Sequence, residues 1–413
     1  MPTALARRLG PFDAVVLGLG SMLGAGVFTA FAPAAEAAGS GLLLGLAVAA
    51  VVAYCNATSS ARLAALYPVS GGTYVYGRER LGDVWGYLAG WAFVVGKTAS
   101  CAAMALTVGA YVAPAHVRPV AVGTVVALTA VNYFGVRKSL WVTHAIVAVV
   151  LGVLGAVAVA CLAADSPDPA NLTPLVGHGL GGVLQAAGFL FFAFAGYARI
   201  ATLGEEVRDP ARTIPRAITL ALGLTLLVYA VVAVAVLTVL GPRGVAATTA
   251  PLAAAVAATS WAWLEPVVRA GAGVAAVGSL LALVLGVSRT TLAMARDRHF
   301  PRALAAVHPR YGVPHRAELA VGAVVVAVVL AADVRGAIGF SSFTVLVYYA
   351  IANAAALTLG ARSVPVLGLA GCLVLAASLP SWSTLSGLGT LAAGLLVYTS
   401  RSLTRNARDT SPP

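Results

Sequence analysis

Long runs of apolar residues follow one another along the whole chain, separated by short polar or charged stretches. Each run is close to the ~20 residues that an α-helix needs to cross a bilayer. A β-barrel would show short segments of alternating apolar and polar residues instead. The pattern predicts an all-α membrane protein with twelve transmembrane helices, at residues 12–33, 41–63, 83–113, 119–135, 140–163, 181–203, 216–240, 266–290, 317–333, 337–359, 364–379 and 383–400.

Glycines interrupt the first predicted helix near its middle. Residues 19–28 include Gly20, Gly24 and Gly26 and carry no charge, and glycine is the poorest helix former after proline. In hydrocarbon, a broken helix exposes N–H and C=O groups that cost several kcal/mol each when unpaired. Such a break is tolerated where the freed groups face a cavity or a ligand. The segment is therefore a candidate binding site.

The sixth predicted helix has a matching segment, in which residues 189–199 place Gly196 and alanines between aromatic residues. Alone, this segment is also typical of helix packing through small residues. The two segments lie five helices apart, however, and an odd offset makes the two helices run in opposite directions. Two broken helices so related are the signature of an inverted repeat in transporters.

This relation predicts the organisation of the chain. We expect a five-plus-five inverted repeat with discontinuous helices 1 and 6, followed by two extra C-terminal helices. The expected units are a first repeat at 1–165, a second repeat at 166–362, helices 11 and 12 at 363–403, and a disordered cytoplasmic tail at 404–413. The last two helices carry few polar residues and are expected to be peripheral.

Composition and charge agree with a membrane protein. The 413 residues are 60% hydrophobic and 10% charged, whereas soluble domains carry about 25% charged residues. The net charge of +12 comes mostly from loops on one side of the predicted helices; the opposite loops hold only Arg118, Arg243, Arg269 and Arg335. The positive-inside rule then places both termini in the cytoplasm of a cell-membrane protein. Because the positive charge faces anionic lipid, nucleic acid is not an expected partner.

Several classes of chemistry are disfavoured. The four cysteines lie in or beside apolar segments without metal-ligand spacing, so no metal or cofactor is expected. All fourteen carboxylates lie at predicted helix ends or in loops, which disfavours a proton relay through carboxylates. No clustered set of catalytic residues is present, so an enzyme is not expected. The N-terminus also lacks the pattern of a cleavable signal peptide.

Backbone groups, hydroxyls, aromatic rings and Lys97 remain at mid-membrane depth. N–H groups at a half-helix N-terminus suit a carboxylate, and carbonyls at a half-helix C-terminus suit an ammonium. A site with both suits a zwitterion such as a free amino acid, with walls formed by the aromatic residues Phe191, Phe192, Phe194, Tyr348 and Tyr349. Lys97 lies too deep to reach either surface easily and needs a partner, so it is the coupling candidate.

Two predicted cytoplasmic loops each allow two interpretations. Residues 67–74 are typical of an interfacial hairpin with tyrosine anchors, but Tyr74 is also a gate candidate. The loop at 204–216 is either a solvated turn that carries topogenic charge or a loop whose ion pairs close the inward side. In the second interpretation Glu205 and Glu206 are gate candidates.

Taken together, these motifs resemble the amino acid–polyamine–organocation superfamily, and within it the permeases related to cationic amino-acid transporters. The similarity runs from about Phe12 to Gly360. It is carried by residues 24–28, 67–74, 191–197, 205–210 with 214–215, and 294–297 with 300–301.

The resemblance implies the inverted-repeat fold and alternating access. It also implies that N–H groups around Ala25, Gly26 and Val27 bind the substrate carboxylate, and that carbonyls near Phe191, Ala193 and Phe194 bind its amino group. The candidate substrate-binding residues are Ser21, Gly24, Ala25, Gly26, Val27, Phe191, Phe192, Ala193, Phe194, Gly196 and Tyr348.

The chain departs from the family pattern at two places. Some relatives have a lysine in the fifth helix, where this chain has Val150, and Lys97 is a candidate to supply that charge. An acidic residue often follows the sixth-helix aromatic, but here Ala198 and Arg199 follow Tyr197.

The function expected is a secondary amino-acid transporter that is proton-coupled or an exchanger, with lipid and protons as the other partners. The alternatives are a transporter of polyamines or other amines with the same fold, and a non-transporting membrane sensor or enzyme.

Overall fold

The structure is a computed structural model that describes residues 10–67, 71–135, 140–164, 167–197, 200, 207–360 and 362–409, except the side chains of 210, 211 and 402–409. Within these ranges its regular elements are α-helices and short 3-10 helices. The α-helices are α1 (Pro11–Met22), α2 (Ala25–Thr29), α3 (Phe31–Ala38), α4 (Leu42–Leu66), α5 (Thr73–Leu81), α6 (Asp83–Val112), α7 (Val117–Tyr133), α8 (Leu140–Leu162), α9 (Gly179–Phe194), α11 (Pro210–Ala246), α12 (Pro251–Ala257), α13 (Glu265–Arg296), α14 (His315–Ala331), α15 (Val334–Leu357), α16 (Ser363–Ser378) and α17 (Ser381–Asp409).

The number of helices able to cross a membrane is nine in the described ranges, or ten if α16 and α17 form one bent span. The chain changes direction by 116° between these two helices. Two of the twelve predicted spans are short in the structure: α14 has 17 residues and α16 has 16, against the ~20 that cross a bilayer. The chain is thus a multi-pass, all-helical membrane protein, and the count of twelve stays a prediction.

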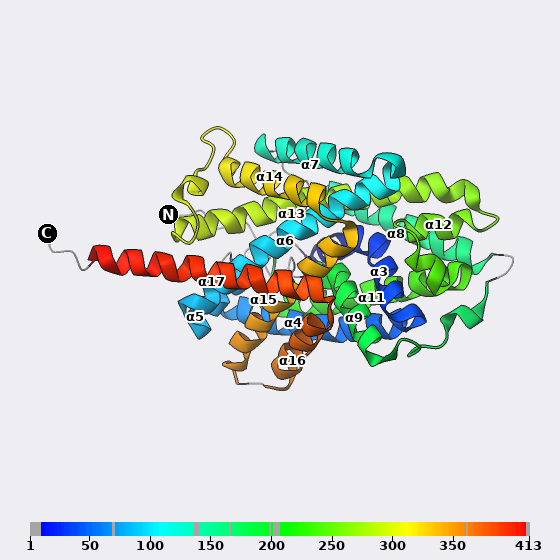
Figure 1. The fold of residues 1–413 in the computed structure, drawn as a ribbon, viewed down its shortest axis with the longest axis horizontal. Coiled ribbons are helices and arrows are strands. Elements are labelled where there is room, and N and C mark those ends of the chain that lie inside the picture. The colour runs from blue at the N-terminus through cyan, green and yellow to red at the C-terminus, as the bar shows by residue number, and fades with distance from the viewer. Residues whose placement is uncertain are drawn as a thin grey trace.

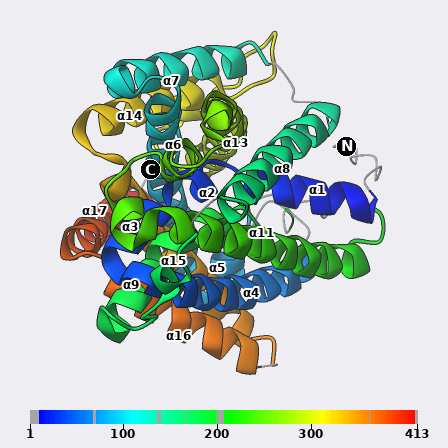
Figure 2. The ribbon, with the colours of Figure 1, turned by 90° about the vertical axis from the view of Figure 1, so that its right-hand side faces the viewer.

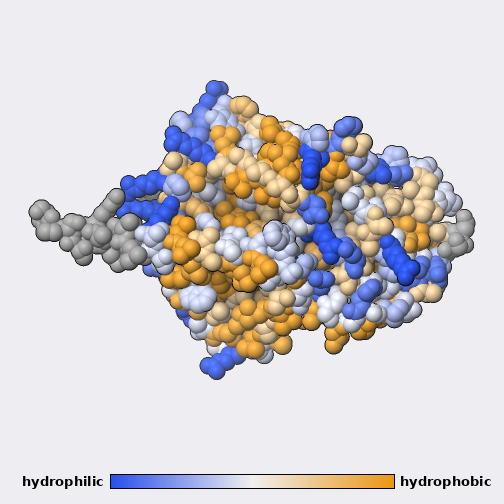
Figure 3. All heavy atoms as spheres, viewed as in Figure 1, coloured by the Kyte–Doolittle hydropathy of each residue, from blue (hydrophilic) through white to orange (hydrophobic). Residues whose placement is uncertain are grey.

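The helices form an elongated bundle (Figure 1). In the second view, α7 and α14 lie together at one edge and α16 lies at the opposite edge (Figure 2). On the face shown in Figure 3, a broad hydrophobic band separates hydrophilic residues near the left end from a second hydrophilic group right of centre. Such a band is the surface that a membrane-embedded bundle presents to lipid.

The helices α6 and α15 pack closely in the middle of the bundle, and small residues allow this approach. A Cβ atom at Gly96 would overlap the side chain of Thr344. One turn further along α6, the hydroxyls of Ser100 and Ser341 are 2.5 Å apart. Small and hydroxyl-bearing residues are the usual contacts between membrane helices, where lipid and protein are equally apolar.

Candidate functional site

The first transmembrane stretch is interrupted at two residues. Helix α1 ends at Met22, and α2 begins at Ala25. Between them, Leu23 has a ψ of 44° and Gly24 has a φ of −95° with a ψ of −145°, so neither residue is helical. The gap lies inside the glycine-rich segment, where the sequence predicts a break.

The sixth predicted helix also changes its geometry where the sequence places Gly196. Helix α9 ends at Phe194 and continues as the 3-10 helix η4 (Ala195–Tyr197). The N–H of Ala195 donates to the Phe191 carbonyl. Residues 198 and 199, which follow η4, lie outside the described residues.

These two segments touch each other through their glycines. A Cβ atom at Gly26 would lie 2.6 Å from the Cα of Ala193, and one at Gly196 would overlap the carbonyl of Ser21. Real Cβ atoms do not come so close to backbone atoms. Only glycine permits this approach at either position, so the two segments meet backbone to backbone.

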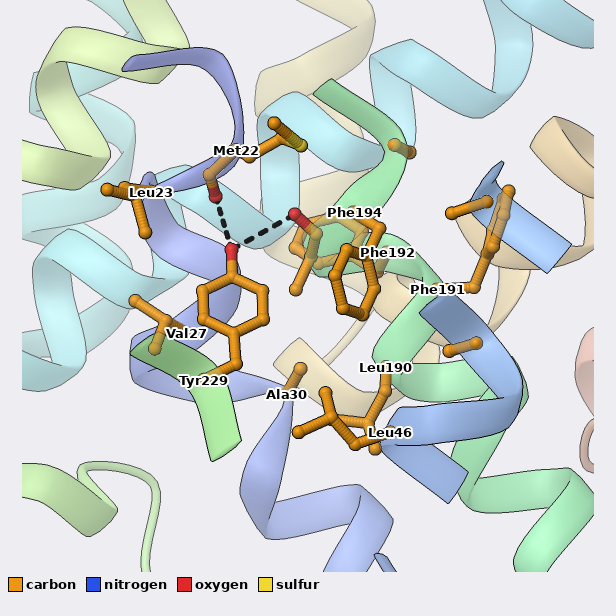
Figure 4. Close-up of a cluster of buried hydrophobic side chains, with 14 of the residues drawn as sticks. Met22, Leu23, Val27, Ala30, Leu46, Leu190, Phe191, Phe192, Phe194 and Tyr229 are labelled. Atoms are coloured by element: carbon orange, nitrogen blue, oxygen red, sulfur yellow. Dashed lines mark hydrogen bonds between the residues drawn. The ribbon is translucent and has the colours of Figure 1, made fainter. Parts of the chain in front are cut away.

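One buried hydroxyl binds both segments. Tyr229, on α11, donates at 2.5 Å to the Met22 carbonyl and lies 3.1 Å from the Ala193 carbonyl (Figure 4). Its ring is fully buried and lies 5.2 Å from that of Phe194. Both carbonyls belong to the last residues of helical segments, which have no partner within their own helix. Tyr229 was not among the predicted site residues, because a lone tyrosine in an apolar helix carries no local signal.

Replacing Tyr229 by Phe tests this bridge. The change removes the single proton that the hydroxyl offers to these buried carbonyls, at a cost of about 1–3 kcal/mol. We expect a lower melting temperature in detergent and roughly tenfold weaker substrate binding, equivalent to about 1.4 kcal/mol. The matched control is Tyr54→Phe, because the Tyr54 side chain is 44% exposed. If both variants behave alike, the Tyr229 hydroxyl does not hold the two segments.

Two further side chains bond to carbonyls near the breaks. Tyr111 donates at 2.6 Å to the Phe28 carbonyl, just after the gap in the first helix. Lys97, on α6, is 8% exposed, and its Nζ lies 3.5 Å from the Ala195 carbonyl in η4. The coupling candidate predicted from the sequence therefore lies against the end of the sixth-helix segment. Among the described residues, no carboxylate forms an ion pair with it.

The predicted substrate-binding residues of the first segment surround the gap. Gly24, Ala25, Gly26 and Val27 are buried. Gly24 lies against the side chain of Ser279, a residue of α13 that the sequence analysis did not select. The Ser21 hydroxyl donates to the Leu17 carbonyl at 2.9 Å, so this hydroxyl is bonded within its own helix.

The predicted aromatic walls fall into two groups. Phe191 and Phe194 are fully buried at the C-terminal end of α9, and the ring of Phe191 lies 5.9 Å from that of Tyr349. Tyr348 is connected elsewhere, because its hydroxyl accepts a hydrogen bond of 3.1 Å from the N–H of Thr73, at the start of α5. Tyr348 therefore joins the α5 end of the bundle to the ring of Tyr349, which is 5.0 Å away.

A polar cluster lies directly beside η4. Tyr197, Tyr349 and Asn56 are buried, and the Tyr197 hydroxyl neighbours the other two side chains and the Cys372 thiol. The Asn56 carbonyl oxygen accepts from Asn353 at 2.6 Å and from Cys372 at 3.3 Å. The two tyrosine hydroxyls and the Asn56 amide nitrogen make no hydrogen bond of ordinary geometry with the described residues.

The gate candidates are only partly described. Tyr74 lies at the start of α5, and its hydroxyl donates to Asp297 at 2.5 Å and lies 2.9 Å from His299 Nδ1. Glu205 and Glu206 lie outside the described residues. The structure thus places Tyr74 in a polar contact with the end of α13.

One carboxylate is more deeply placed than its position in the sequence indicates. Glu318 lies in the first turn of α14, at a predicted helix end, yet it is fully buried. Neither of its oxygens has a hydrogen-bond partner among the described residues. Packing of α14 against neighbouring helices causes this burial, and one-dimensional patterns do not reveal it. Within the described ranges, no three potential metal ligands lie close together.

Comparison with known proteins places this chain in a family. The model of the amino acid permease family matches residues 13–367. An uncharacterized transporter of Mycobacterium tuberculosis is 69% identical, over 99% of this chain and 95% of its own length. The branched-chain amino acid permease BcaP of Bacillus subtilis is 28% identical, over 76% of this chain and 72% of its own. The human cationic amino acid transporter 4 is 30% identical, over 84% of this chain and 59% of its own.

Proposed function

We propose a function from one premise: the chain belongs to the amino acid permease family, and it is a transporter rather than an enzyme. The substrate class that this family supports is a small amino acid-type molecule. On that premise, the protein is a secondary active transporter that moves an amino acid by alternating access. Transport is coupled to protons or proceeds by exchange.

The observation that carries this proposal is the contact, at Gly26 and Gly196, between the interrupted first segment and the segment where α9 passes into η4. In our proposal, N–H groups around Ala25, Gly26 and Val27 bind the carboxylate of the substrate. Such N–H groups favour negative charge. The rings of Phe191 and Phe194 then cover the side chain of the substrate.

The amino group of the substrate needs a carbonyl near the sixth-helix break. The Ala193 carbonyl lies 3.1 Å from the Tyr229 hydroxyl, and the Ala195 carbonyl faces Lys97. Each carbonyl has two acceptor positions, so Ala193 retains one for a substrate ammonium. Lys97 then supplies a positive charge, and its contact with the Ala195 carbonyl forms or breaks as transport is coupled to the driving ion or exchanged substrate.

The same proposal includes the architecture and orientation. The chain is a five-plus-five inverted repeat with two additional helices, and both termini lie in the cytoplasm of the cell membrane. The excess of Arg and Lys in the loops on one side supports this orientation. The α5 end of the bundle, where Tyr74 meets Asp297, is then the cytoplasmic end.

A second candidate function is transport of a polyamine or another organic amine by the same fold. Buried carboxylates would suit such polycations. The segments around the breaks instead contribute backbone, aromatic and small side chains, and Lys97 is a cation. The Lys97 ammonium would repel a polycationic substrate bound beside it, so an amino acid is the better fit.

Uptake by purified protein in liposomes tests the proposal. A panel of labelled amino acids and polyamines is offered with and without an inward proton gradient. We expect one group of amino acids to enter, with accumulation driven by the gradient or by preloaded substrate. Uptake of polyamines alone supports the second candidate, and uptake of neither contradicts both.

A further inference from the structure

The C-terminal helix α17 reaches further than a membrane span requires. It has 29 residues, whereas about 20 cross a bilayer. It runs along the outside of the bundle, and its C-terminal end lies on the same side as α5 (Figure 1). The sequence predicts a peripheral helix, but the described side chains near this end make specific contacts.

Arg401 of α17 holds the turn that follows α13. Its Nη1 donates at 2.6 Å to the His299 carbonyl and at 3.3 Å to the Arg298 carbonyl. Arg298 has a φ of +64°, in the left-handed region that non-glycine residues seldom adopt. Such a conformation persists where surrounding contacts fix it, and hydrogen bonds from a guanidinium are among the stronger ones.

Tyr398 adds ring contacts one turn before Arg401. Its ring lies 5.0 Å from that of Tyr87 on α6 and 6.1 Å from that of His299. The rings of Tyr87 and His299 are themselves 5.2 Å apart, edge to face. The side chain of His299 is therefore packed between α6 and α17.

The same turn holds Tyr74. The Tyr74 hydroxyl bonds to Asp297 and lies within hydrogen-bond distance of His299, and Arg78 lies 3.3 Å from Asp297. Burial and then the hydrogen bond to Asp297 raise the pKa of the Tyr74 hydroxyl, so it keeps its proton and remains a donor. The adjacent Thr73 N–H bonds to Tyr348. A continuous set of contacts thus leads from α17 through the turn and α5 to α15.

We infer that α17 holds a cytoplasmic gate closed. The gate is the contact between Tyr74 and the turn at 297–299, and Arg401 and Tyr398 lock this turn in place against Tyr74. Separation of α5 from the end of α13 then requires the turn to leave Arg401 or α17 to move with it. Arg401 is a positioning residue, since it acts on the gate through backbone carbonyls. The inference rests on the proposed alternating access and the proposed orientation.

Access to position 73 tests the lock without requiring transport. Thr73 is 1% exposed, so a Thr73→Cys variant is labelled by a membrane-impermeant maleimide only when this end opens. Inside-out vesicles present it to the reagent. The same vesicles without the Thr73 change correct for the four native cysteines, all buried.

Arg401→Ala in this background should speed labelling roughly tenfold, because the turn loses the charge-assisted hydrogen bonds that hold it in place. Tyr398→Ala should act in the same direction, and Arg401→Lys should restore most of the slow labelling because an ammonium also donates to carbonyls. The matched control is Arg316→Ala, since Arg316 is an exposed arginine at the start of α14.

Unchanged labelling in both Arg401→Ala and Tyr398→Ala would overturn the inference, as would an equal increase in Arg316→Ala. Size-exclusion profiles show whether each variant is folded, and Tyr398→Ala provides the test if Arg401→Ala is not. Failure of the wild-type protein to move any amino acid would instead contradict the proposed function, while the labelling rates would still report on the lock.

Discussion

Lys97→Ala is expected to abolish gradient-driven accumulation of substrate while leaving substrate binding nearly unchanged. The Lys97 side chain is buried, and its Nζ lies 3.5 Å from the Ala195 carbonyl. A charge at this depth is costly and is usually functional. Its removal takes away the basic side chain that contacts the Ala195 carbonyl, so this group can no longer respond to a proton or to the membrane potential. Accumulation in liposomes with an imposed proton gradient measures the effect.

The control for Lys97 lies next to it. Thr98 is bonded to the Val94 carbonyl of its own helix, so Thr98→Val changes the same part of α6 without removing a charge. We expect this variant to accumulate substrate as the wild type does. Binding is measured separately, by thermal stabilisation with substrate. If Lys97→Ala accumulates substrate normally, Lys97 has no role in coupling.

Gly26→Val is expected to produce the largest loss of substrate binding. A Cβ atom at this position meets the Cα of Ala193 at 2.6 Å, and neither backbone can yield without moving a helix. Inserting such atoms into a packed site costs about 1–3 kcal/mol. The displaced segments no longer present their N–H and C=O groups to one substrate, so we expect affinity to fall by at least roughly a hundredfold. Isothermal titration or substrate-dependent melting measures it.

The control for Gly26 is a glycine at which an added side chain would meet no neighbouring atom. Gly152, in α8, has open space where a Cβ would lie, so Gly152→Val changes helix propensity without a collision. We expect this variant to bind normally and to melt near the wild-type temperature. If Gly26→Val loses stability and binding in equal measure, Gly26 serves packing alone.

The parts of the site that could be predicted from the sequence are those with a local signal. The gap at Leu23 and Gly24 follows from the crowded glycines, and Lys97 is conspicuous as a cation inside an apolar run. The role of Tyr229 could not be predicted, because its contacts with Met22 and Ala193 depend on how α11 crosses two other helices.

The fold could be predicted in outline for the same reason. Apolar runs identify the membrane helices, but their lengths do not show that the chain changes direction by 116° between α16 and α17. The contacts of Arg401 arise only because α17 extends beyond that bend to reach the turn after α13. Distances along the chain of about a hundred residues separate these partners, so no short motif encodes them.

If the proposed site is right, the close approach of these two helical segments should also limit how substrate specificity diverges among related permeases. At Gly26 and Gly196 the two backbones lie too close for any side chain larger than the hydrogen atom of glycine, so these positions cannot vary. The rings of Phe191 and Phe194 carry no such restriction. A relative adapted to another substrate should therefore exchange its aromatic residues and retain both glycines, and selection experiments for a new substrate should yield the same division.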